Sequence, residues 1–138
     1  TELIELSKND TNFALLTSIP GIGQNLAARL IAEIGDISRF DNAKQLVAYA
    51  GIDPQVYESG SFKGKFSISK KGNKRLRSLL YIAVSCSLRN NLKDNSFKDY
   101  YKRKTQQGKI HKVVLIACCN KLIRVIYSMC NTGTLYEY

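Results

Sequence analysis

Serine hydroxyls and basic side chains are concentrated in residues 57–80 of this chain. This segment carries seven Lys or Arg residues against one acidic residue, Glu58. A serine can attack a phosphorus centre when a base removes its proton and cations stabilise the charge that develops on the phosphoryl oxygens. Lysine and arginine neutralise phosphates, so these residue types favour a site that meets a phosphodiester backbone. The serines of the segment's loop are Ser59, Ser61, Ser67 and Ser69.

Candidate phosphate-binding residues follow the first two serines. They are Lys63, Lys65, Lys70, Lys71, Asn73, Lys74, Arg75 and Arg77. The sequence shows no evident general base. Glu58 is next to Ser59, but its side chain can point away from the serine hydroxyls, and His111 lies far along the chain. The remaining acidic residues are scattered, without the pairing that holds catalytic Mg²⁺. The sequence therefore predicts no Ser-His-Asp arrangement, no metal site and no cofactor bound by this chain.

The net charge of +10 is unevenly distributed. Residues 1–56 contain four basic and seven acidic residues, residues 57–80 contain seven and one, and residues 81–138 contain ten and three. This asymmetry places the cationic surface in the middle and C-terminal parts and indicates an anionic polymer, with nucleic acid favoured. With 138 residues and 44% hydrophobic content, the chain is expected to fold as one domain, residues 1–138.

A membrane partner is not expected, because the most apolar run, residues 113–119, is far shorter than the roughly 20 residues of a spanning helix. The N-terminus lacks the basic-then-apolar layout of a secretory signal, which indicates a cytoplasmic protein. The four cysteines lie in apolar helical patterns without C-x-x-C spacing. They are predicted to be buried free thiols.

Helical periodicity predicts an all-α fold. Asp41 is the expected N-cap of the third helix, while Gly35 and Gly51 are expected to end the second and third. Residues 51–72 have no helical period and are expected to form a long basic loop, with at most a small β-ribbon at residues 65–69. The last helix is apolar around much of its circumference and should be central to the core. The expected helices cover residues 13–19, 26–34, 41–50, 74–88, 96–107 and 109–130.

Gly21 and Gly23 lie in a run, Ile19–Ala28, that resembles the hairpin of helix-hairpin-helix DNA-binding modules. There, glycines permit a tight turn whose backbone N–H groups accept a phosphate. The surroundings are poor in basic residues, since Arg29 is the only one in residues 13–35. A DNA contact and a purely structural corner are both open readings of this hairpin.

Nearly the whole chain resembles the C-terminal domain of insertion-sequence transposases related to the Piv-type DNA invertases (the insertion-sequence 110/116/902 family). The matching segments are LLTSIPGIGQNLAARLIAEIGDISRF, LVAYAGIDPQVYESGSFKGKFSISKKGNKRLRSLL and KIHKVVLIACCNKLIRVIYSM. The most specific element is the ordered series Gly51-Ile-Asp-Pro, Ser59-Gly60, Ile68-Ser69-Lys70 and Lys71-Gly72-Asn73 with Leu76-Arg77.

The resemblance implies DNA recombination by a serine nucleophile. The serine of the family's Ser-Gly motif falls on Ser59, with Ser61 as the fallback, and the basic segment Lys70–Arg77 is implied to contact the DNA backbone nearby. The resemblance also implies a RuvC-like N-terminal domain with a DEDD set of acidic ligands for Mg²⁺. That domain is absent from this chain, whose start, with Leu3, Ile4 and Leu6, looks like the tail of a longer helix.

The partners implied by the resemblance are DNA, the RuvC-like domain, further protomers in a homo-oligomer and, in some members, a guide RNA. The resemblance also implies a bacterial protein that acts at the nucleoid. Two other readings are open. One is a non-catalytic helix-hairpin-helix module of a repair or junction-processing protein. The other is a protein-interaction domain whose charge serves solubility, for which DNA affinity at physiological salt would be negligible.

Overall fold

The computed structural model describes residues 11–52, 72–89 and 94–137, and over these ranges the chain is helical and contains no strand. The prediction of an all-α fold is confirmed. The β-ribbon expected at residues 65–69 lies outside the described residues. The elements are α2 (Thr11–Thr17), α3 (Gln24–Ile34), the short 3-10 helix η1 (Ile37–Arg39), α4 (Ala43–Ala50), α6 (Lys74–Ser87), α7 (Ser96–Gln106) and α8 (His111–Thr132).

The helix ends follow local backbone chemistry. Gly35 has φ +71° and its N–H donates to the carbonyl of Ile31, so it ends α3 as predicted. Gly51 is left-handed and ends α4, again as predicted. The prediction of Asp41 as the N-cap of α4 is wrong by one residue. Asn42 is the cap, since its side chain accepts from the N–H of Gln45 at 3.0 Å while the Gln45 side chain reaches back to Asp41.

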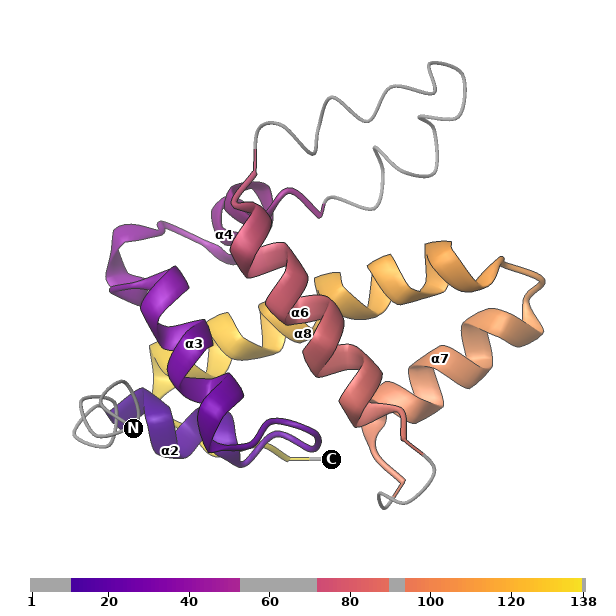
Figure 1. Cartoon of the computed structure of the whole chain (residues 1–138), viewed down its shortest axis with the longest axis horizontal. Coiled ribbons are helices and arrows are strands. Elements are labelled where there is room, and N and C mark those ends of the chain that lie inside the picture. The colour runs from indigo at the N-terminus through magenta and orange to yellow at the C-terminus, as the bar shows by residue number, and fades with distance from the viewer. Residues whose placement is uncertain (1–10, 53–71, 90–93, 138) are drawn as a thin grey trace.

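Helix α8 is the central element of the fold. It crosses the molecule behind α6, and α4, α6 and α7 all pack against it (Figure 1). Its buried side chains recur at helical spacing along most of its length, as the apolar sequence predicted. They are Val114, Ile116, Cys118, Cys119, Leu122, Ile123, Ile126 and Met129.

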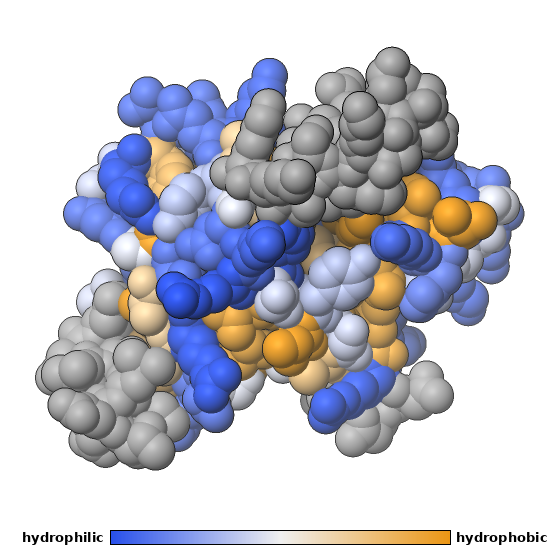
Figure 2. Space-filling view, turned by 45° about the horizontal axis from the view of Figure 1, so that its top comes forward, coloured by the Kyte–Doolittle hydropathy of each residue, from blue (hydrophilic) through white to orange (hydrophobic). Residues whose placement is uncertain are grey.

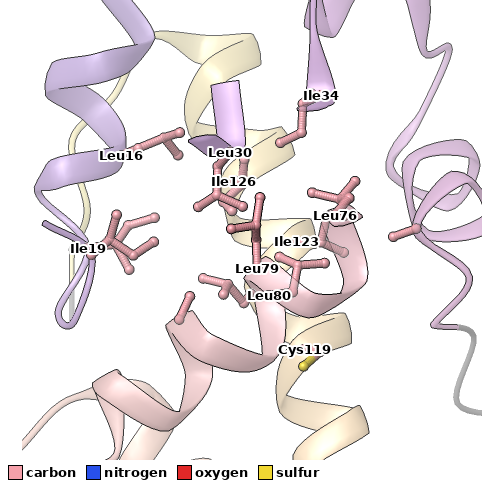
Figure 3. Close-up of a cluster of buried hydrophobic side chains, with 14 of the residues drawn as sticks. Leu16, Ile19, Leu30, Ile34, Leu76, Leu79, Leu80, Cys119, Ile123 and Ile126 are labelled. Atoms are coloured by element: carbon pink, nitrogen blue, oxygen red, sulfur yellow. The ribbon is translucent and has the colours of Figure 1, made fainter. Parts of the chain in front are cut away.

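The core joins segments that are far apart in the sequence. Side chains from the α2–α3 region, α6 and α8 converge in one cluster (Figure 3). Leu30 of α3, Leu80 of α6 and Ile123 of α8 are all fully buried in this cluster. Each such side chain stabilises the fold by roughly 1.5–3 kcal/mol. The N-terminal hairpin and the C-terminal helix therefore depend on one another for stability.

By length and hydropathy alone, α8 could also cross a membrane, and it is the one described helix with that property. Core helices of globular domains share this composition. In this fold the buried face of α8 packs on α4, α6 and α7. Elsewhere the surface is mixed, with hydrophobic residues between hydrophilic ones (Figure 2), and the large exposed hydrophobic residues include Ile82, Ile110 and Leu135.

All four cysteines are free thiols, as predicted, but the prediction that all four are buried is wrong for Cys86 and Cys130. Cys118 and Cys119 are buried on α8, whereas Cys86 and Cys130 are only partly buried. Burial raises the pKa of Cys118 to about 11 and raises that of Cys119 as well, because the thiolate is poorly solvated inside the core. These two thiols are therefore structural and unreactive.

The turn between α2 and α3 is held against the C-terminal end of α6. Gly21 has φ +92°, and a Cβ there would lie 2.5 Å from the backbone nitrogen of Ser87. By contrast, a Cβ on Gly23 would meet nothing within 4 Å. The expected arrangement of helix, tight turn and helix is present, and its first glycine is required by intramolecular packing.

We predict that Gly21→Ala lowers the free energy of unfolding by roughly 1–3 kcal/mol, because the new methyl group forces α6 away and the backbone keeps a strained positive φ. Urea unfolding followed by circular dichroism measures this loss. Gly23→Ser is the matched control, since serine suits an N-cap with extended backbone and should leave stability equal or slightly higher. Equal stability of wild type and Gly21→Ala would contradict the packing argument.

Candidate nucleic-acid interface

Six of the predicted site residues are described by the structure. Asn73, Lys74, Arg75 and Arg77 lie together at the N-terminal end of α6. Gly21 and Gly23 lie at the α2–α3 hairpin, and Gly21 packs against Ser87 at the opposite end of α6. A helix of 14 residues is roughly 20 Å long, so the hairpin and the basic turn are separate surfaces. The predicted residues outside the described ranges are Ser59, Ser61, Lys63, Lys65, Lys70 and Lys71.

The residues that flank segment 53–71 meet backbone to backbone. A Cβ on Gly72 would lie 2.5 Å from the Cα of Gly51 and 2.6 Å from its nitrogen. Gly51 also has φ +72°, a conformation that favours glycine. The N–H of Asn73 donates to the carbonyl of Tyr49 at 2.7 Å, which adds a hydrogen bond to this contact. The chain therefore leaves α4 and enters α6 at the same point.

Asn73 joins three helices through one amide group. Its Oδ1 accepts the N–H of Leu76 at 3.0 Å and so caps α6. Its Nδ2 donates to Oε1 of Glu33 on α3 and to the hydroxyl of Tyr49 on α4, both at 3.1 Å. The Tyr49 hydroxyl in turn donates to the backbone carbonyl of Glu33 at 3.3 Å. We call Gly51, Gly72, Asn73 and these partners the latch.

Arg77 supports the latch from the second turn of α6. Its Nη1 donates to the carbonyl of Ala50 at 3.2 Å. This carbonyl belongs to the last residue of α4, where a cation also complements the negative end of the helix dipole. The guanidinium lies so close to Gly51 that a Cβ there would come within 2.7 Å of Nη1. Arg77 thus has an intramolecular function in addition to the phosphate contact predicted for it.

A second arginine, Arg39, supports the latch through its contact with Tyr49. Its Nε and Nη2 donate to the carbonyl of Ile34 at 3.1 and 2.6 Å, which satisfies the end of α3. The guanidinium lies over the rings of Phe40 and Tyr49, at 4.7 and 4.8 Å from their centroids. Hydrogen bonding from Arg39 and, next, from Asn73 lowers the pKa of Tyr49. Sequence reasoning missed Arg39, Tyr49 and Glu33, whose contacts are visible only in three dimensions.

Lys74 and Arg75 differ from Arg77 because both are exposed. They occupy the first turn of α6, which contains no acidic residue. Cations at a helix N-terminus oppose the helix dipole, so this placement does not favour the stability of α6. A groove of about 430 Å³ runs beside them between α3 and α6 and is lined by Arg29, Ala32, Glu33, Lys74, Arg75, Ser78, Leu79 and Ile82. This end of α6 offers positive charge to an anion.

His111 begins α8 and is exposed. Its Nδ1 forms a hydrogen bond with the hydroxyl of Tyr101. Within the described ranges, no three His, Cys, Asp or Glu residues lie close enough together to hold a metal ion.

Comparison with known proteins identifies the family of the chain. The sequence model of the family described as "Transposase IS116/IS110/IS902 family" matches residues 13–102. The pilin gene-inverting protein of Moraxella bovis is 39% identical over 84% of this chain and 36% of its own length. The transposase for insertion sequence element IS1111A of Coxiella burnetii is 28% identical over 99% of this chain and 37% of its own.

The chain belongs to the IS116/IS110/IS902 transposase family. This confirms the resemblance inferred from the sequence. The chain spans about a third of the length of the curated relatives it matches, for example 33% of an insertion element IS116 protein of Streptomyces clavuligerus. The family match covers all the latch residues and the two arginines that support them, Arg39 and Arg77.

We predict that Asn73→Ala lowers the free energy of unfolding by about 2 kcal/mol, because it removes both the cap of α6 and the links to Glu33 and Tyr49. Asn73→Ser keeps an acceptor for the cap and should lose about half as much. Chemical denaturation measures both values. Lys74→Ala is the control and should change stability by less than about 0.5 kcal/mol. The latch assignment fails if all three variants unfold at the same denaturant concentration.

Proposed function

We propose that this chain is the serine-bearing DNA-recombination domain of a transposase, with Ser59 as the nucleophile and Ser61 as the fallback. Family membership supports this proposal. The observation that carries it is the latch, since the family's ordered motif has its two flanks, Gly51 and Gly72, joined beside the exposed cations Lys74 and Arg75. The domain acts on DNA together with a RuvC-like domain that is not part of this chain.

In the proposed reaction, Oγ of Ser59 attacks a DNA phosphorus atom. A P–Oγ bond forms, one P–O bond of the strand breaks, and the departing oxygen takes up a proton. The serine proton passes to a base outside this chain. A free 3′-hydroxyl of another strand later attacks the same phosphorus, which forms the new phosphodiester and releases Ser59. Acidic ligands for Mg²⁺ belong, in this proposal, to the RuvC-like domain.

The basic side chains of this chain bind the DNA and stabilise charge. Lys63, Lys65, Lys70 and Lys71 neutralise the phosphoryl oxygens near the nucleophile, where negative charge increases during attack. Lys74 and Arg75 hold neighbouring phosphates at the N-terminal end of α6, where backbone N–H groups add to the attraction. The latch holds Gly51 and Gly72, which flank segment 53–71, directly beside Lys74 and Arg75.

The remaining parts of the proposal follow from the family resemblance. They are a guide RNA, assembly of several protomers around two DNA sites, and action at the bacterial nucleoid in the cytoplasm. Sequence preference is not part of the proposal.

A helix-hairpin-helix module without catalysis is the second candidate function. One observation favours it, since Gly23 at the start of α3 is exposed and makes no side-chain cap, so the N–H groups of the first turn face outward. Gly21, however, is explained by its contact with Ser87. The α3 hairpin and the α6 basic turn lie at opposite ends of α6, so point variants separate the two candidates.

For catalysis we predict that Ser59→Ala, in the protein that also carries the RuvC-like domain, binds DNA normally but loses strand exchange by at least about 10³-fold, because the nucleophile is gone. Denaturing gels should also show no covalent protein–DNA adduct. Ser61→Ala is the matched control and should retain both. Normal activity of Ser59→Ala together with loss in Ser61→Ala would move the nucleophile to Ser61.

For binding we predict that the 138-residue chain binds duplex DNA but does not recombine it, even with Mg²⁺. Lys74→Gln with Arg75→Gln should weaken binding about 10- to 100-fold at 0.1 M salt and make the salt dependence shallower by about 2, or roughly 0.9 per lost phosphate contact. Fluorescence anisotropy over a salt series measures both quantities.

Gly23→Val discriminates between the two candidates, because it adds a branched side chain at the start of α3, where the hairpin candidate places a phosphate, while a Cβ there meets no other described part of the chain. A larger loss for Gly23→Val than for the α6 pair would favour the helix-hairpin-helix module. Lys44→Gln with Arg89→Gln removes the same charge from exposed positions elsewhere and serves as the control. Negligible affinity of the wild-type chain would favour a protein-interaction domain.

A further inference from the structure

Three cations surround one aromatic ring on the α7–α8 hairpin, away from the latch. The Tyr100 ring has Arg103 at 5.3 Å, Lys104 at 5.5 Å and Lys121 at 5.4 Å from its centroid. Arg103 and Lys104 belong to α7, one turn beyond Tyr100, whereas Lys121 comes from α8. The two helices pack side by side at one edge of the molecule (Figure 1). The fold thus collects positive charge from two separate helices at one point.

A groove of about 380 Å³ continues this charged cluster along α8. Its lining consists of Tyr100, Ala117, Asn120, Lys121, Arg124, Val125 and Ser128. None of the residues that line it is a carboxylate. The groove is therefore a cationic surface with polar donors and a small apolar component.

Asn120, which lines this groove, has a side-chain nitrogen without a hydrogen-bond partner within the described ranges. Nε of Arg124 donates to Oδ1 of Asn120 at 2.9 Å, which fixes the orientation of the amide. The Asn120 Nδ2 is then buried and makes no hydrogen bond. A buried donor without a partner is costly, and an acceptor in the groove reaches this nitrogen only if the surrounding side chains shift.

The cluster needs an anion for electrostatic reasons. Lys121, Arg103 and Lys104 approach the same ring, so their charges lie within about one Debye length of each other, ~10 Å at 0.1 M salt. Their mutual repulsion is only partly offset by the electron-rich face of Tyr100. A phosphate is a strong acceptor for Lys, for Arg and for an amide N–H group, and successive phosphates can span two helices.

We propose that this α7–α8 groove binds the phosphodiester backbone of the DNA substrate, as a second contact separate from the basic turn of α6. The proposal rests on the proposed function in one respect, namely that the substrate is DNA. DNA is favoured over an acidic protein because the family consists of transposases and because cations of two helices gather beside a groove that no carboxylate lines. The contact carries no sequence information and positions the duplex.

The test uses Lys121→Gln with Arg124→Gln in the 138-residue chain. Duplex DNA binding, measured by anisotropy over a salt series, should weaken about 10- to 100-fold at 0.1 M salt, and its salt dependence should become shallower by about 2. The loss should be the same for duplexes of unrelated sequence. Lys44→Gln with Arg89→Gln is the charge-matched control and should lose much less. Circular dichroism should show unchanged helix content in both variants.

The outcomes separate this proposal from the proposed function. If the α7–α8 pair behaves like the control while the α6 pair loses affinity, the α7–α8 groove is not a DNA contact and the proposed function stands. If wild type does not bind DNA, the proposed function fails first. The same variants are tested with an RNA duplex and a single-stranded RNA of equal length. Loss of RNA binding alone would assign the groove to RNA and overturn the proposal.

Discussion

The amide of Asn73 is the group on which the arrangement of α3, α4 and α6 depends. Its carbonyl oxygen starts α6, and its nitrogen is shared between the Glu33 carboxylate and the Tyr49 hydroxyl. Because one planar group makes these contacts, the direction of α6 is fixed relative to α3 and α4. The close approach of Gly51 and Gly72 is possible only with that direction. Family motifs of this kind can encode geometry as well as chemistry.

The latch also explains how a domain can carry basic residues with two different tasks. Arg77 and Arg39 direct their guanidinium groups to backbone carbonyls at the ends of α4 and α3. Lys74 and Arg75, one and two residues after Asn73, are exposed to solvent. The structural arginines use the planar, multiple-donor geometry that lysine lacks. The exposed pair requires only charge. Position on the helix, rather than residue type alone, separates the two groups.

Much of the fold could be predicted from the sequence, because its helices have clear apolar periodicity and its stops are glycines. Residues 74–88 and 96–107 were predicted as helices, and the structure places α6 and α7 at almost the same bounds. The N-cap of α4 was assigned to Asp41 instead of Asn42, since both types suit a cap and only the backbone geometry decides. The roles of Glu33 and Tyr49 could not be predicted, because their partner is 40 and 24 residues away in the sequence. The fit of Gly21 against Ser87 has the same long-range origin.

The last helix has a consequence for the order in which the domain can assemble. Ile123 and Ile126 fill the space between the N-terminal hairpin and α6, and beyond α8 the N–H of Tyr136 donates to the Ser18 hydroxyl at 2.9 Å. Before α8 is in place, the hairpin and α6 can bury only the surface that they share with each other. Closure of the core therefore waits for α8, because α8 buries its side chains against segments far earlier in the sequence. A chain truncated before α8 would then lack a closed core and would leave the apolar faces of the hairpin and α6 open to aggregation.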